Sequence, residues 1–353
     1  DGVMQEKTQF GRRLPAAVSA ALPVELRAMA GLGPIGLEPQ TGSFFREIEG
    51  RMWDFRLHAC PMAQGERLVV SIVAPAAQAG LMGLALSEAD LAALRRPLSE
   101  PAGLVLVTGP SRPQRRAMLR AMLNELNSHR RALLCLECEA EPLIEGVSQL
   151  HHDVGEDCGR EELLAVVSGQ DPDVVAVEDV GAATPAAVAV ELSCDGRLAL
   201  GGLAGRGSAD ALSALCGLSD RPIALAAGLL AVVESRTLRR VCPHCRTTRA
   251  ADPELLARLG VERLGFEVAA GTGCSHCGGS GHRGTMTICS VIEADAVIAK
   301  LLRLGSDYGA FEHAIRLSGR NTLARRAVDG LARQQFSLEE LIRVLPRLKL
   351  PVE

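Results

Sequence analysis

The sequence predicts an α/β protein, in which a parallel sheet with crossover helices follows a small α+β domain and precedes a metal-stapled, mostly helical region. Apolar strands alternate with helical patterns from Ser87 to about Val241, as in parallel sheets with crossover helices. Two Cys-x-x-Cys pairs follow this alternation, as in metal-binding modules. The 353 residues provide enough chain for two or more domains with buried cores.

The first domain is expected at residues 1–85, as an α+β domain truncated at its N-terminus. Its strand-like segments are Phe44–Glu47, Met52–His58 and Leu68–Val73, separated by turn-rich stretches. The small residues of 76–83 are expected to form a linker to the next domain.

The second domain is expected at residues 86–241. Its predicted strands are Gly103–Thr108, Ala132–Glu137, Val174–Val177 and Leu198–Leu203. The helical patterns between them are Gln114–Ser128, Arg160–Gly169, Thr184–Leu192 and Ala209–Leu215. A tetracysteine module at 242–290 and a helical C-terminal region at 291–353 complete the predicted organisation.

Composition narrows the function classes. The chain has 38 basic and 42 acidic residues, a net charge of −4, which provides no global attraction to nucleic acid or to anionic lipid. The sequence contains no run of about 18 uncharged apolar residues, so no membrane-spanning helix is predicted. No signal peptide is visible. We therefore expect a globular protein without a nucleic acid partner. The two Cys-x-x-Cys pairs indicate metal binding in a reducing compartment.

A strand, a Gly-Pro turn and a helical pattern at residues 104–126 form the frame of a nucleotide-binding phosphate loop. A working loop reads G-x-x-x-x-G-K-[ST]: its backbone N–H groups surround the β-phosphate, its Lys reaches the β/γ oxygens and its hydroxyl holds Mg²⁺. Counted from Gly109, the second Gly is Gln114, the Lys is Arg115 and the hydroxyl residue is Arg116. The candidate phosphate-binding positions are therefore vestigial: Gly109, Pro110, Ser111, Arg115 and Arg116.

Three arginines, at 112, 115 and 116, cluster at the predicted start of the following helix. The helix dipole disfavours cations at this end. A solvated surface is the expected arrangement. Docking to an acidic partner, or to a nucleotide held in a new way, is the alternative.

The cysteine pairs are the most intact chemical motif. Cys242, Cys245, Cys274 and Cys277 form C-x₂-C, 28 residues and C-x₂-C, a spacing at which two knuckles can close a tetrahedral Zn²⁺ shell. A closed Cys₄ shell leaves no open position for a substrate, so a structural zinc is predicted. Redox chemistry and a nucleic-acid-binding zinc ribbon are weighed as alternatives, and the missing basic–aromatic pattern argues against the ribbon. His244 and His276, inside the knuckles, are expected to be exposed rather than ligands.

The order of these features resembles the traffic ATPases of type II secretion and type IV pilus assembly. Residues 171–175, DPDVV, are similar to the family's "DPDVI" strand, and residues 238–245, LRRVCPHC, to its "LVRRLCPHC". The "DGVLQE", "RLKVMAGL" and "DVRVST.P..GERVV" segments find counterparts at 1–6, 27–32 and 54–69. Further likenesses, to "TGYKGR" and to the closing "GM.TL..DGL…TS.EE" helices, fall at 281–284, 319–323, 329–331 and 337–340.

The resemblance implies a RecA-like P-loop NTPase core. It also implies a hexameric, Mg–ATP-driven motor on the cytoplasmic face of the inner membrane, where it acts on a membrane platform protein to extend a pseudopilus or pilus. The chain would then be cytoplasmic and peripheral to that membrane. Related ATPase subunits would complete a homo- or hetero-hexamer.

The family's catalytic motifs carry over poorly. The "TIEDPVE" box keeps its Glu as Glu137 but has Cys138 for the Asp. The "GEIRD" segment has Asp179 at the Glu position and Glu178 at the Gly position. The "GHLVLSTLHTNDA" box loses both histidines, to residues 197 and 204. Glu137 and Asp179 are therefore vestigial catalytic positions.

The arginines Arg56 and Arg67 of the first domain remain, and the resemblance implies that they can face a neighbour's nucleotide. Because one oriented catalytic group is typically worth about 10²–10⁴-fold in rate, the combined losses predict little hydrolysis and make ATP and Mg²⁺ doubtful cofactors. Three functions are weighed: a catalytically inactive structural or regulatory subunit, a divergent active ATPase, and a zinc-dependent interaction module outside secretion.

Overall fold

The computed structural model describes residues 16–34, 38–48, 51–63, 65–73, 80–128, 130–138, 143–151, 159–261, 264–318, 322–346 and 348. These residues belong to two compact units, 2–77 with 139–143, and 78–138 with 144–353. The likenesses at residues 1–6 and 319–321, and the second half of the Glu137 box, lie outside the described residues. No helix in the part of the chain that the structure describes combines the length and the apolar character needed to cross a bilayer.

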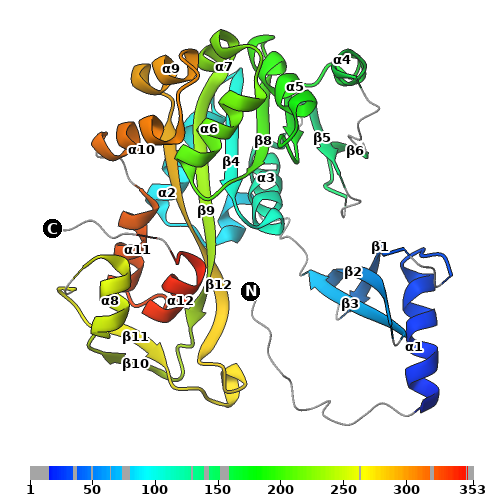
Figure 1. The fold of residues 1–353 in the computed structure, drawn as a ribbon, viewed down its shortest axis with the longest axis vertical. Helices are drawn as coiled ribbons and strands as arrows, with labels where there is room; N and C mark the ends of the chain where they lie inside the picture. The colour runs from blue at the N-terminus through cyan, green and yellow to red at the C-terminus, as the bar shows by residue number, and fades with distance from the viewer. Residues whose placement is uncertain are drawn as a thin grey trace. The chain divides into compact units, whose positions relative to one another are not determined.

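The first unit contains one helix and an antiparallel three-stranded sheet (Figure 1). The helix is α1 (Ala16–Met29), and the strands are β1 (Gln40–Ile48), β2 (Arg51–Met62) and β3 (Gly65–Val73), in the order β1-β2-β3. The three predicted strand segments are thus confirmed, with longer bounds. Arg27 of α1 forms an ion pair with Glu66 of β3 and donates to the Gln40 side chain at 2.5 Å, so that one buried guanidinium connects the helix to both outer strands.

The second unit is built on a seven-stranded sheet with the order β12-β9-β4-β8-β7-β5-β6. Its strands are β4 (Gly103–Gly109), β5 (Leu133–Glu137), β6 (Val147–His151), β7 (Val174–Val177), β8 (Leu198–Ala204), β9 (Leu229–Val241) and β12 (His282–Glu293). All neighbours are parallel except β12 with β9. The four strands that the sequence predicts for this region are confirmed, because each is a short apolar run that the sheet buries on both faces.

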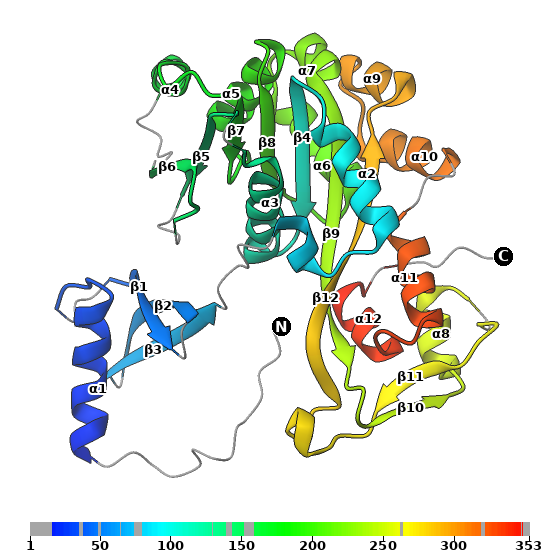
Figure 2. The ribbon, with the colours of Figure 1, turned by 180° about the vertical axis from the view of Figure 1, so that it is seen from behind.

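Helices cover both faces of this sheet (Figures 1 and 2). One buried cluster lies under α4 (Arg160–Ser168), α5 (Ala183–Cys194), α6 (Ser208–Leu218), α7 (Pro222–Gly228), α9 (Ala296–Arg303) and α10 (Tyr308–Leu317). The other lies under α2 (Glu88–Leu98), α3 (Arg112–Leu126) and a 3₁₀ helix at Gly80–Leu84. Leu81 of that turn is fully buried, so the predicted small-residue linker is wrong from residue 80 onward.

The strands β9 and β12 continue past the sheet as a two-stranded arm (Figure 1). Beyond the sheet they pack with α8 (Pro253–Leu259), α11 (Leu323–Ala332) and α12 (Leu338–Val344) into a third core. The small sheet of β10 (Arg246–Arg249) and β11 (Val268–Gly271) lies in the same region. The helices predicted after residue 291 are confirmed, but α9 and α10 return to the core of the main sheet. The predicted domain boundaries at 86, 242 and 291 stay predictions.

Candidate functional site

The turn between β4 and α3, here called the phosphate-loop turn after its predicted role, is short and has no anion-binding nest. β4 ends at Gly109 and α3 begins at Arg112, so Pro110 and Ser111 alone connect them. None of the residues 109–116 has a positive φ. The alternation of right- and left-handed conformations that turns successive N–H groups toward a phosphate is therefore missing. Ser111, the N-cap residue, makes no side-chain capping hydrogen bond.

The basic cluster at the start of α3 is paired internally rather than solvated. Arg116 donates from Nε to Glu178 Oε1 at 2.7 Å and also forms an ion pair with it through Nη2. Arg112 Nε lies 3.0 Å from the same oxygen. The Cys138 amide donates to Glu178 Oε2 at 2.9 Å, so both oxygens of the carboxylate are engaged. The segment after β7 thus binds directly to the start of α3.

Arg115, at the position of the phosphate lysine, is also turned inward. Its Nη1 donates to the Gly109 carbonyl at 2.8 Å, and its Nη2 lies 3.8 Å from Asp179 Oδ2. Burial lowers the pKa of the Arg115 guanidinium, while the Asp179 charge opposes this shift. Arg115 and Arg116 are 3% and 6% exposed. The predicted solvated surface is therefore wrong for both, because carboxylates far away in the sequence fold against them.

The other vestigial catalytic positions differ in how firmly they are held. Glu137 Oε1 accepts from Arg120 Nη1 and from Gln149 Nε2, each at 3.0 Å. Burial raises the pKa of the Glu137 carboxyl, and the Gln149 hydrogen bond and the Arg120 charge oppose the rise. Asp179 is freer: its side chain is 34% exposed, and its Oδ1 accepts from the Gly181 amide at 2.8 Å.

The two replaced histidine positions lie at opposite ends of β8. Arg197 precedes the strand and pairs with Asp195, whereas Ala204 ends the strand, beside Gly109 of β4. The arginine therefore lies away from the phosphate-loop turn and cannot substitute for a histidine near it.

Arg56 and Arg67 lie on one face of the first unit's sheet. Arg56 is paired in register with Ser43 and Ser71, and Arg67 with Cys60, four positions further along β2. Because side chains alternate across a strand, an even separation places both on the same face. Their role toward a neighbour's nucleotide stays a prediction.

One buried arginine that the sequence analysis did not single out connects the loops around Gly109. Arg236, on β9, donates to the Arg206 carbonyl at 2.6 Å and pairs with Glu234 at 3.2 Å. Glu234 also accepts from the Ser208 amide at 3.1 Å. A Cβ at Gly109 would lie 3.3 Å from Arg236 Nη1, so this side chain packs closely beside the turn. The available signal was the polar Glu-Ser-Arg-Thr stretch at 234–237, which interrupts the apolar residues of this strand.

The structure brings the four cysteines of the knuckles together. Their sulfurs all lie within 4.8 Å of one another, with Sγ–Sγ distances of 3.9 Å for Cys242–Cys274 and Cys245–Cys277 and 3.7 Å for Cys274–Cys277. Four sulfurs at about 2.3 Å from a tetrahedral Zn²⁺ would be about 3.8 Å apart. The thiols are therefore placed to hold a metal ion.

Backbone groups beside Cys277 favour the thiolate form of this residue. Cys277 Sγ accepts from the Cys274 amide at 3.2 Å and from the Gly281 amide at 3.3 Å. Burial would raise the pKa of the Cys277 thiol, but these N–H donors and the neighbouring thiols lower it to about 6. Glycine is required beside them, because a Cβ at Gly271 would lie 2.0 Å from the Gly281 carbonyl oxygen.

The histidines inside the knuckles are exposed, as predicted. Among the described residues, the group placed to hold a metal ion contains the four cysteines and neither His244 nor His276. The two rings stack on each other instead, with centroids 4.0 Å apart and planes 14° from parallel. The sequence analysis did not foresee this contact between the knuckles.

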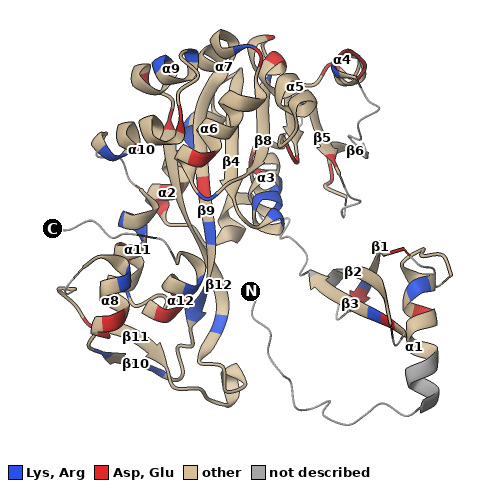
Figure 3. Ribbon diagram, viewed as in Figure 1, with Lys and Arg blue, Asp and Glu red and all other residues tan. Residues whose placement is uncertain are grey.

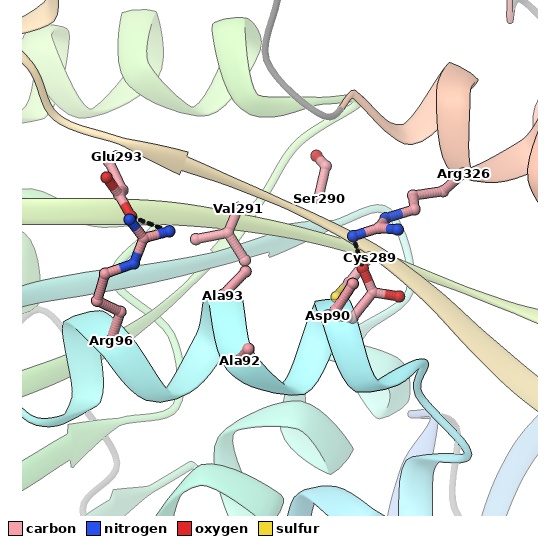
Figure 4. Close-up of a pocket in the computed structure, with 10 residues that line it drawn as sticks. Asp90, Ala92, Ala93, Arg96, Cys289, Ser290, Val291, Glu293 and Arg326 are labelled. Atoms are coloured by element: carbon pink, nitrogen blue, oxygen red, sulfur yellow. Dashed lines mark ion pairs between the residues drawn. The ribbon is translucent and has the colours of Figure 1, made fainter.

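A groove of about 560 Å³ lies between α2 and β12, away from the phosphate-loop turn (Figure 4). Asp90 of α2 pairs with Arg326 of α11 at 2.6 Å at one end, and Arg96 pairs with Glu293 at 2.9 Å at the other. Cys289 lies buried at its base, where burial raises the pKa of its thiol. The groove contains none of the predicted site residues, and its ion pairs hold α11 and β12 to α2.

The comparisons with known proteins agree with this architecture. The family described as "Type II/IV secretion system protein" matches residues 9–343, and the chain belongs to this family. It is 29% identical to the type II secretion system protein E of Aeromonas hydrophila, over 98% of this chain and 68% of that protein. It is 31% identical to the type II secretion system protein E of Pectobacterium carotovorum subsp. carotovorum, with the same coverage of 98% and 68%. The chain thus spans about two thirds of the length of these relatives.

Solved structures show the same fold at low identity. The pilus retraction motor PilT with bound ADP matches with a TM-score of 0.60 and 16% identity, over 97% of this chain and 88% of that one. The ATPase DotB of Yersinia pseudotuberculosis matches with a TM-score of 0.60 and 11% identity, over 94% and 80%. These likenesses establish the α/β fold that the sequence predicts.

Proposed function

We propose that this chain is a non-hydrolysing member of its family, a structural or regulatory subunit of a type II secretion or type IV pilus-like machine. The observation that carries the proposal is the pairing of Arg112 and Arg116 with Glu178. A Mg–ATP site needs cationic and N–H groups free for phosphate and a carboxylate or hydroxyl free for the metal. Here both oxygens of the Glu178 carboxylate accept from groups of the protein, and Arg116 is buried against it.

The turn geometry supports the same conclusion. The turn has no left-handed residue among 109–116, and Pro113 lacks an N–H donor. Arg115, which stands at the lysine position, already donates to the Gly109 carbonyl. Arg is also a poor substitute for the compact Lys ammonium in a tight backbone cradle. ATP and Mg²⁺ are accordingly not its cofactors, and a structural Zn²⁺ in the Cys₄ cluster is.

The proposed setting follows from the family. The relatives are named as type II secretion proteins E, and one structural neighbour is a pilus retraction motor. We infer that this subunit works on the cytoplasmic side of the inner membrane, in a homo- or hetero-hexamer with related ATPase subunits and against a membrane platform protein. Nucleic acid is not among its partners.

A divergent active ATPase is the second candidate, and Asp179 favours it. Its carboxylate is a third exposed, and its nearest cation lies 3.8 Å away, so it is available to a metal or to a water molecule. This candidate requires Mg²⁺-dependent turnover that Asp179→Asn abolishes.

The test is phosphate release from Mg–ATP by the zinc-loaded chain, measured at concentrations where sedimentation shows the assembled oligomer. The proposal predicts release at the background rate in the wild type and in Asp179→Asn alike. Turnover that Asp179→Asn removes would overturn the proposal and establish the divergent ATPase instead.

A further inference from the structure

The two cysteine knuckles form a basic surface in an acidic protein. Residues 240–249 and 271–287 contain no Asp, Glu or Lys, whereas the chain as a whole has a net charge of −4. Their arginines are all exposed: Arg240, Arg246, Arg249 and Arg283. Figure 3 shows basic positions on β10 and on the part of β12 beyond the main sheet. A divalent ion on four thiolates leaves two negative charges. Because Arg249 is paired with Glu339, the other three arginines leave the surface with a small positive charge.

The strand β10 offers an open edge on this surface. It pairs with β11 alone in a two-stranded sheet, and its four residues are all exposed. The Thr272 amide donates to the Cys245 carbonyl at 3.1 Å. Antiparallel residues alternate between bonding the partner strand and facing away from it, so Arg246 and Thr248 present their N–H and C=O groups to the open edge. Such an edge is a template for an extended chain.

Other polyanions fit this surface less well. The basic segments contain no Phe, Tyr or Trp on which nucleic acid bases could stack. Their larger apolar side chains, such as Val241 and Met286, are buried, so little is available for insertion into a bilayer.

We propose that β10 binds an extended acidic segment of a partner protein by strand addition, with Arg246 contacting its carboxylates. Backbone hydrogen bonds to Arg246 and Thr248 supply the pairing, and the basic surface selects acidic side chains and orients the approach. This inference is independent of whether the chain hydrolyses ATP.

The experiment uses the full zinc-loaded chain and a labelled octapeptide in which Glu and Val alternate. Fluorescence anisotropy at low salt is expected to show saturable binding, and a peptide alternating Lys and Val is expected not to bind. Methylation of alternate backbone nitrogens of the Glu peptide removes its N–H donors while keeping its charge. We expect this change to weaken binding by about tenfold, since one or two edge hydrogen bonds are lost.

Two substitutions separate charge from strand pairing. Arg246→Glu is expected to weaken binding by about tenfold or more, whereas Arg303→Glu, a matched reversal at an exposed site on α9, leaves it unchanged. Thr248→Pro removes the outward N–H and is expected to weaken binding by a similar factor. Zinc content and the melting curve show whether each variant is folded. If Thr248→Pro does not fold, Arg246→Glu still decides the test.

Three results would overturn the inference. The first is equal binding of the Glu, Lys and N-methylated peptides. The second is an Arg246→Glu variant that binds as the wild type does. The third is tighter binding of phosphatidylglycerol vesicles or of an oligonucleotide than of the peptide, because either polyanion would then be the better occupant of this surface.

Discussion

The phosphate-loop turn and the cysteine cluster are both meeting points of distant segments, but their charges are arranged in opposite ways. At the turn, Arg112 and Arg116 of α3 meet Glu178, more than sixty residues away, and both arginines share this one carboxylate. At the cluster, four thiols from two knuckles converge, and the group consists of these four sulfurs. The first site is filled by its own side chains, whereas the second is placed to hold a metal ion.

This difference separates charged groups that pair within the chain from thiols that are placed to hold a metal ion. A buried ion pair that is complete within the chain contributes to one fixed arrangement and has no group left for a ligand. Converging thiolates repel one another until a metal neutralises them, so that the metal's binding free energy becomes folding free energy. The two sites should therefore respond differently to the loss of one group, and the predictions below test this difference.

The largest effect is expected at the cysteine cluster. Cys274→Ser should abolish stoichiometric zinc binding and unfold the region around the knuckles, because structural zinc sites are worth about 10–16 kcal/mol in small domains. Metal analysis and thermal melting measure the effect. Cys60→Ser in the first unit is the matched control and should keep the metal. Full zinc retention in Cys274→Ser would contradict the assignment of the site.

The next effect concerns the closed turn. Glu178→Ala should lower the free energy of unfolding by about 3–5 kcal/mol, because Arg116 would be left buried without its carboxylate. Replacing both residues, as Glu178→Met with Arg116→Met, should recover part of the loss. Chemical denaturation measures both variants, with exposed Glu161→Ala as a control that changes little. A Glu178→Ala variant as stable as this control would show that the turn is not held closed by the pair.

A third effect concerns a buried ion pair that packs beside the arm of β9 and β12. Glu340 of α12 is buried and accepts from Arg239 and Arg343. Burial raises the pKa of its carboxyl, but these donors together lower it to about 2. Because this pKa lies below the unfolded value, the stabilisation is complete above about pH 5 and is lost as the pH falls toward 2.

Glu340→Gln should therefore be about 2–3 kcal/mol less stable than the wild type at pH 7 and nearly equal to it near pH 2. The difference between their denaturation curves at several pH values measures this contribution, and acid release of the metal affects both proteins alike. A gap that stays constant with pH would refute the role of the Glu340 charge.

The smallest effect is expected where an ion pair is exposed. Arg249 of β10 forms an ion pair with Glu339 of α12, and the two side chains are 56% and 46% exposed. Arg249→Ala should change the free energy of unfolding by at most about 1 kcal/mol, because solvent screens such pairs. A loss comparable with that of Glu178→Ala would mean that burial does not decide the strength of these pairs.

The sheet was predictable from sequence because its strands are apolar on both faces. The runs at residues 103–108, 174–177 and 198–203 leave few alternatives once helical patterns separate them. The cysteine cluster was predictable because two-residue spacing fixes each knuckle locally. In contrast, the continuation of β9 and β12 into one arm depends on a pairing between segments some fifty residues apart, which no local pattern indicates.

The charge pairing at the turn was not predictable for the same reason. The cluster at 112, 115 and 116 was visible in the sequence, but nothing local indicated that Glu178 and Asp179 would meet it. The fold brings the end of β7 beside the start of α3, and burial then selects pairing over solvation. The prediction of solvated arginines was wrong because tertiary contacts, rather than local polarity, determine the environment of these side chains.

The most direct test of the account is equilibrium binding of ATP to the wild-type chain, with and without Mg²⁺. Because both oxygens of Glu178 accept from protein groups and Arg115 and Arg116 are buried, we predict no saturable binding at millimolar ATP, and no change on adding Mg²⁺. Saturable binding that tightens with Mg²⁺ would contradict it, because the turn would then open to accept the nucleotide.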